Sequence, residues 1–161
     1  MADEPERWRA LKAYTITLWF LAFLFFLRVL GQVLVAFFDV GFLPPMAEWY
    51  SGLLPYPILL PIQVVILILQ FKVGTDFSRG TGFFVIPRSG MGRFLLWFSY
   101  VYFAAMVLRY LVSMALYPER RWFGGTIPIF FHWVLAAYLF VLGLFHTRMG
   151  SPSSSEIAQG T

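Results

Sequence analysis

The chain has 161 residues, of which 60% are hydrophobic, 12% are charged and none is cysteine. A soluble domain carries about 25% charged residues, so this chain has too few charges to cover a surface that faces water. The composition also excludes a disordered chain, a disulfide-stapled secreted domain and any cysteine-ligated metal site. We therefore predict an integral membrane protein.

Four stretches are long and apolar enough to cross about 30 Å of hydrocarbon as helices. The predicted fold is all-α, with four transmembrane helices arranged as two hairpins in a domain over residues 1–150, followed by a polar tail over 151–161. The second stretch contains Pro61, which should break the helix unless it lies in the first turn or at a kink. The predicted spans cover residues 14–38, 56–71, 94–117 and 126–147.

The lysines and arginines that flank these stretches predict the orientation, because basic flanks resist translocation. Eight of them fall in the N-terminal flank, the middle loop and the tail, and two fall in the third loop. We expect both termini in the cytoplasm and a plasma or inner membrane location. The net charge of +4 then matches a surface that faces anionic lipid, and it requires no nucleic acid as a partner.

Two connecting segments have distinct compositions. The outer loop over residues 39–55 is nearly uncharged, so we expect it to lie on the membrane or to dip into the protein. The middle loop over residues 72–93 is rich in glycine, and its apolar run from Phe83 to Ile86 is a candidate hairpin strand.

Each predicted span contributes a polar residue to one level of the membrane. Arg28 and Arg109 fall roughly 12–15 Å below the outer boundary, and Gln63 and His132 fall roughly 9–11 Å below it. At 100° per residue, Gln32 shares a helix face with Arg28, while Tyr102 and Ser113 share one with Arg109. Lipid cannot satisfy these groups, so the faces should point into the bundle.

Two interpretations of this polar layer remain open. In the first, the arginines reach outward to Asp39, Glu48 or Glu119, and the amide and imidazole groups complete a network that fixes helix packing. In the second, the two positive charges form an anion site, because no carboxylate occurs within a span at that depth. Such a site suits a lipid phosphate, a carboxylate substrate or haem propionates.

The two histidines of the chain, His132 and His146, lie fourteen residues apart on the last span, with the small residues Ala136 and Gly143 along the same stripe. This spacing resembles the haem-ligating histidine pairs in transmembrane helices of the cytochrome b family. The resemblance implies haem b as a cofactor held by both histidines. Ligation of two haems needs four histidines, so a second chain would have to supply the others.

The spans contain no carboxylate pair, no metal-binding histidine spacing and no nucleophile turn, which argues against an enzyme. We expect a non-enzymatic membrane protein, either an accessory or assembly subunit of a larger membrane complex or a lipid- or anion-binding protein. The alternative is a haem-bearing electron-transfer subunit. Partners would be the lipid bilayer and either other membrane subunits or a second copy of the chain.

Overall fold

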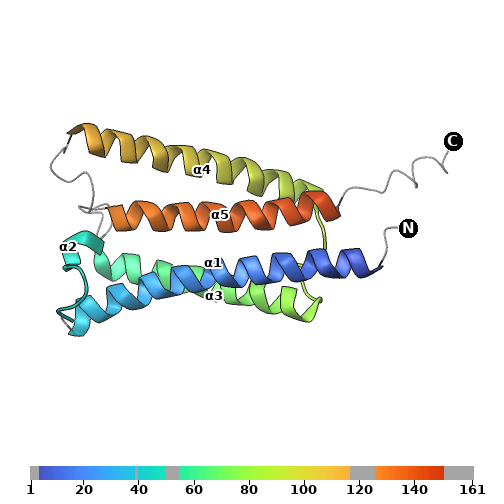
Figure 1. The fold of residues 1–161 in the computed structure, drawn as a ribbon, viewed down its shortest axis with the longest axis horizontal. Helices are drawn as coiled ribbons and strands as arrows, with labels where there is room; N and C mark the ends of the chain where they lie inside the picture. Colours follow the sequence, from blue (N-terminus) through green and yellow to red (C-terminus); the bar gives the residue numbers. More distant parts are fainter. Residues whose placement is uncertain (1–3, 39, 50–54, 117–125, 151–161) are drawn as a thin grey trace.

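The computed structural model describes residues 4–38, 40–49, 55–116 and 126–150, and the architecture is all-α (Figure 1). Four long helices are each long and apolar enough to cross a membrane, as predicted. A fifth, short helix follows the first. The helices are α1 (Glu4–Phe38), α2 (Met46–Trp49), α3 (Tyr56–Arg79), α4 (Ser89–Leu116) and α5 (Thr126–Met149).

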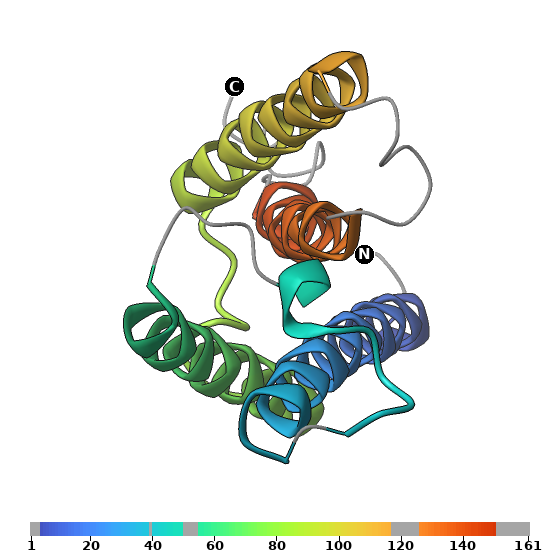
Figure 2. The same cartoon turned by 90° about the vertical axis from the view of Figure 1, so that its left-hand side faces the viewer.

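The long helices form two hairpins, α1 with α3 and α4 with α5, which meet along α1 and α5. Figure 2 looks down the bundle and shows α5 between α4 and α1, with α3 beside α1. Among the described residues, α4 packs on α5 and makes no helix contact with α1 or α3. We call the end where α1 begins and α5 ends the terminal end, and the end that carries α2 the distal end.

The seam between the hairpins is built on a stripe of buried residues along α1. Leu18, Ala22, Phe25 and Val29 are each at most 5% exposed and recur at intervals of three or four, which places them on one helix face. Leu18 and Ala22 of this face pack against α5 and α3 in a cluster with Tyr138 and other buried residues. The other members of the cluster are Val73, Phe77, Leu142 and Phe145.

Helix α3 is longer than the predicted span of residues 56–71. It remains continuous through Pro61, with Pro57 in its first turn, and ends at Arg79 before the left-handed Gly80. Lys72 and Asp76, one turn apart, form an ion pair in the added segment. The span was predicted too short because hydropathy follows the apolar run and does not detect this pairing.

The predicted hairpin strand at residues 83–86 is wrong, because these residues form a turn. The carboxylate of Asp76 accepts a hydrogen bond from the backbone N–H of Phe84 at 3.5 Å, which folds the segment back onto the end of α3. Phe84 and Val85 then pack against the buried cluster, and the described residues contain no strand with which they could pair.

The outer loop dips into the protein at Trp49. This side chain is 7% exposed, and its indole N–H donates to the backbone carbonyl of Pro44 at 2.9 Å. Its ring lies directly against Gly31 of α1, where an added Cβ would come within 2.6 Å of it. Glycine at position 31 therefore lets α2 approach α1 closely.

Candidate functional site

The predicted polar layer lies in the distal half of the bundle, and its centre is Gln32. This residue continues the buried stripe of α1 and is fully buried. Its carbonyl oxygen accepts two hydrogen bonds, one from the Gln63 amide of α3 at 3.0 Å and one from the Arg28 guanidinium at 3.4 Å. The structure therefore joins three of the predicted layer residues, from two helices, in one network.

This network leaves several polar atoms unsatisfied. Arg28 Nε, Gln32 Nε2 and Gln63 Oε1 are buried and have no hydrogen-bond partner among the described residues. Buried polar groups are nearly always paired, and leaving one unpaired costs about 1–3 kcal/mol. Two of the three atoms are donors, so the network offers more hydrogen-bond donors than its own acceptors take up.

The charge of Arg28 is also uncompensated by the described side chains. Its side chain is 6% exposed, and the carboxylates whose side chains are described, Glu6 and Asp76, belong to the terminal end. The guanidinium carbon lies 5.7 Å from the centroid of the Phe131 ring, a cation–π contact that offsets a part of the desolvation. The carboxyl groups predicted as its alternative partners, those of Asp39, Glu48 and Glu119, lie outside the described side chains.

On the other side of the layer, the hydroxyl of Tyr102 on α4 forms a short hydrogen bond with His132 Nδ1 on α5. The two rings meet edge to face, with centroids 5.7 Å apart. Both Arg28 and Arg109 lie within electrostatic range of the His132 ring. The layer therefore contains two positive charges that both act on His132 of this polar pair.

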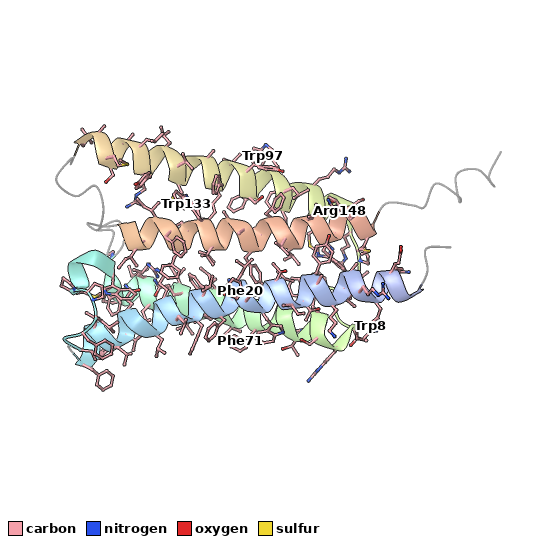
Figure 3. All side chains as sticks on the ribbon, in the orientation of Figure 1. Trp8, Phe20, Phe71, Trp97, Trp133 and Arg148 are labelled. Carbon is pink, nitrogen blue, oxygen red and sulfur yellow. The ribbon has the colours of Figure 1, made fainter. Side chains whose placement is uncertain are left out.

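Two predicted members of the layer are less integrated. Arg109 and Ser113 on α4 are half-buried, and the described residues provide neither of them with a hydrogen bond. Helix α4 diverges from α5 toward the distal end, as Figure 1 shows. Aromatic contacts of Trp133 with Phe103 and Tyr110, at ring distances of 5.8 and 6.1 Å, occupy that space (Figure 3).

The histidine stripe of α5 faces α4, and the surroundings of the two histidines differ. His146 is fully buried near the terminal end, where its Nδ1 accepts a hydrogen bond from the backbone N–H of Arg88 at 3.4 Å. The small residue Gly143 is covered by α4, since an added Cβ would come within 2.9 Å of the Leu96 backbone nitrogen. At the His146 end of this stripe, α4 therefore packs closely against α5.

Between the two histidines, the α4–α5 interface opens into an apolar hollow of about 260 Å³. Ala136, the other small residue predicted on the histidine stripe, forms part of its wall. The hollow is lined by Ser99, Tyr100, Phe103, Ala136, Ala137 and Phe140.

Sequence reasoning missed two parts of this interior. Tyr102 was placed on the correct face of its helix but was not identified as the partner of His132. Gln70 was missed altogether, although it follows Gln63 by seven residues and therefore lies on the same face of α3. It is 3% exposed, and its backbone carbonyl accepts a hydrogen bond from the Tyr138 hydroxyl at 3.2 Å.

Comparison of the chain with protein-family models, with curated proteins and with solved structures found no match.

Proposed function

We propose that this chain is a non-enzymatic, multi-pass membrane protein that binds an anionic group, such as a lipid phosphate, at its polar layer. The observation that carries the proposal is the buried guanidinium of Arg28, which lacks a carboxylate among the described side chains. Placing an arginine at the centre of a membrane helix costs about 2.5–3.5 kcal/mol on insertion scales. A bound anion would offset that cost.

The unpaired donors support an anion over a cation or a neutral ligand. Arg28 Nε and Gln32 Nε2 each carry an N–H that no described acceptor takes up. A guanidinium and an amide N–H together suit the oxygens of a phosphate or carboxylate, and charge-assisted bonds of this kind are the stronger ones. Arg109 adds a second positive charge within electrostatic range of His132.

The test is the retention of phospholipid by the purified full-length protein, measured by native mass spectrometry. We expect Arg28→Gln to lose bound anionic lipid, and Arg109→Gln to weaken its binding. Arg93→Gln is the matched control, because Arg93 is an exposed arginine of α4 outside the layer. A more stable Arg28→Leu variant that keeps all of its bound lipid would contradict the proposal.

The haem-subunit alternative has one observation in its favour. In the tautomer in which His132 Nδ1 donates to the Tyr102 hydroxyl, Nε2 is the nitrogen that could bind iron, and metal-bound histidines usually donate their other ring N–H in this way. A haem on His146 would need the close contact between α4 and α5 to open. Absorption spectra of oxidised and reduced protein test this alternative, since a Soret band should vanish in His132→Ala. A colourless preparation from haem-replete cells would exclude it.

A role as an accessory or assembly subunit is supported by the exposed helix faces. Helix α4 contacts α5 alone among the described helices, and its outer residues, such as Trp97 and Leu108, are 63% and 62% exposed. Lipid or another membrane subunit can cover such a face. Affinity purification in mild detergent tests this role, and recovery of the protein alone and monodisperse would argue against it.

A further inference from the structure

Two adjoining hollows lie at the terminal end, far from the polar layer. Their volumes are about 330 and 340 Å³. They share Trp8 and Leu11 of α1 and Gly80 at the end of α3 as walls. Figure 3 shows Trp8 near the start of α1, on the side where α3 ends. The two hollows therefore adjoin each other across these shared residues, and we call them together the terminal groove.

Three exposed cations line the terminal groove. Arg7 borders one hollow, and Lys12 and Arg79 border the other. Within the described part of the chain, none of the three forms an ion pair with a carboxylate. Lys12 Nζ lies 5.9 Å from the centroid of the Trp8 ring, a contact that holds the ammonium over the shared wall.

The acidic groups near this end leave the cations available. Asp76 is buried and bonded to Lys72 and to the backbone of Phe84, so it does not line the groove, although the charge of Arg79 acts on it. Glu6 is exposed on α1 and lines neither hollow. Among the described side chains the local balance is therefore positive, and an anion is the complementary ligand.

The groove also has an apolar wall that leads away from these charges. Ile16 lies two turns beyond Trp8 along α1, about 12 Å toward the middle of the bundle, and is 61% exposed. Trp8 itself is 66% exposed, and tryptophan is enriched at the level of lipid headgroups. A ligand that matches the groove has an anionic head near Lys12 and an apolar tail along Ile16.

We propose that the terminal groove binds the headgroup of an anionic phospholipid, with its phosphate between Lys12 and Arg79 and its glycerol backbone against Trp8. Basic pockets between membrane helices are suited to anionic headgroups at the cytoplasmic leaflet, the side on which the basic flanks predict this end to lie. The site is separate from the Arg28 layer, and either one can exist without the other.

The test uses the full-length protein and three probes, which are phosphatidylglycerol, phosphatidylcholine and inorganic phosphate. We expect phosphatidylglycerol in large excess over its dissociation constant to raise the melting temperature by about 5 °C relative to phosphatidylcholine. Lys12→Gln combined with Arg79→Gln should abolish the part of that rise that does not depend on Arg28. Arg9→Gln combined with Arg93→Gln is the matched control, because it removes the same charge from exposed arginines that line neither hollow.

The substituted side chains are exposed, so both double variants should melt at the wild-type temperature in phosphatidylcholine. Trp8→Ala provides a second, charge-neutral variant, which should reduce the rise by at least half. An equal loss in the control pair would show that binding follows overall charge and would overturn the proposal. Equal protection by inorganic phosphate would overturn the lipid assignment, as would the absence of any rise. Arg28→Gln should keep the part of the rise that Lys12→Gln combined with Arg79→Gln removes, which separates this site from the polar layer.

Discussion

Gly92 of α4 lies directly against His146 of α5, and a Cβ added to the glycine would come within 2.9 Å of the His146 Cβ. The same added atom would lie 2.7 Å from the backbone nitrogen of Thr147. Because a backbone atom cannot turn away as a flexible side chain can, the absence of a side chain at position 92 sets how closely these two helices approach.

Gly92→Ala should therefore force the two helices apart and destabilise the protein by about 1–3 kcal/mol, the usual cost of overpacking. Gly90→Ala is the control in the same helix, since an added Cβ there meets nothing within 4 Å. Thermal unfolding in detergent should give a lower melting temperature than that of the wild type for Gly92→Ala but not for Gly90→Ala. A wild-type melting temperature for that variant would show that α4 and α5 are less closely packed than described.

The hydrogen bond between Gln32 and Gln63 predicts energetic coupling between α1 and α3. In a double-mutant cycle with Gln32→Leu and Gln63→Leu, we expect a coupling energy of about 0.6 kcal/mol, and at most about 1.7 kcal/mol, the range found for hydrogen bonds between membrane helices. The cycle is measured by reversible unfolding in mixed micelles. Gln32→Leu and Gln70→Leu should be additive, because no described bond joins their side chains. Coupling of similar size in both cycles would argue against the direct bond.

The bond between Tyr102 and His132 should be detectable by removing one oxygen atom. Tyr102→Phe keeps the ring contacts but leaves His132 Nδ1 without its partner, and we expect a loss of about 1 kcal/mol in unfolding free energy. Tyr100→Phe is the matched control, because Tyr100 lies on the same helix, is 62% exposed and has no described hydroxyl partner. Equal unfolding free energies for the two variants would contradict the bond.

Gly82 closes the turn that follows α3, and its backbone φ of 119° is one that L-residues rarely adopt. An added Cβ there would also lie 2.4 Å from the carboxyl carbon of Asp76. Gly82→Ala should cost about 1–3 kcal/mol and should expose residues 80–88 to proteolysis. Gly41→Ala, with nothing within 4 Å of the added atom, should cause neither change. Resistance to protease in the Gly82 variant would count against the described turn.

The existence of the four long helices could be predicted from the four apolar stretches of the sequence, whereas their ends could not. The apolar run predicted a first span that begins at residue 14, but α1 begins at Glu4. Helix α3 likewise continues past the apolar run to Arg79. In that extension Ser78 accepts a hydrogen bond from the Trp19 indole of α1 at 2.9 Å. Such a contact depends on how two helices are placed, and hydropathy along one segment carries no information about it.

The polar layer could likewise be predicted only in part: the network of α1 and α3 follows from the sequence, whereas the contacts of α4 do not. Helical spacing put Arg28 and Gln32 on one face, and depth matched them with Gln63, so their network follows from residue positions. The partner of His132 and the isolation of Ser113 depend on how α4 is rotated and tilted against α5. Those two angles are set by close contacts such as that at Gly92, which the spacing of polar residues does not reveal.

The contact between the two hairpins along α1 and α5 has a consequence for how the chain tolerates change. Within the described residues, α4 adjoins one neighbour and α5 adjoins both hairpins. The outward surface of α4 can therefore accept one apolar residue for another without disturbing α1 or α3. A substitution on α5 changes contacts with both α4 and α1, and therefore affects the packing of both hairpins. Natural variation should accordingly accumulate on α4 and be selected against on α5.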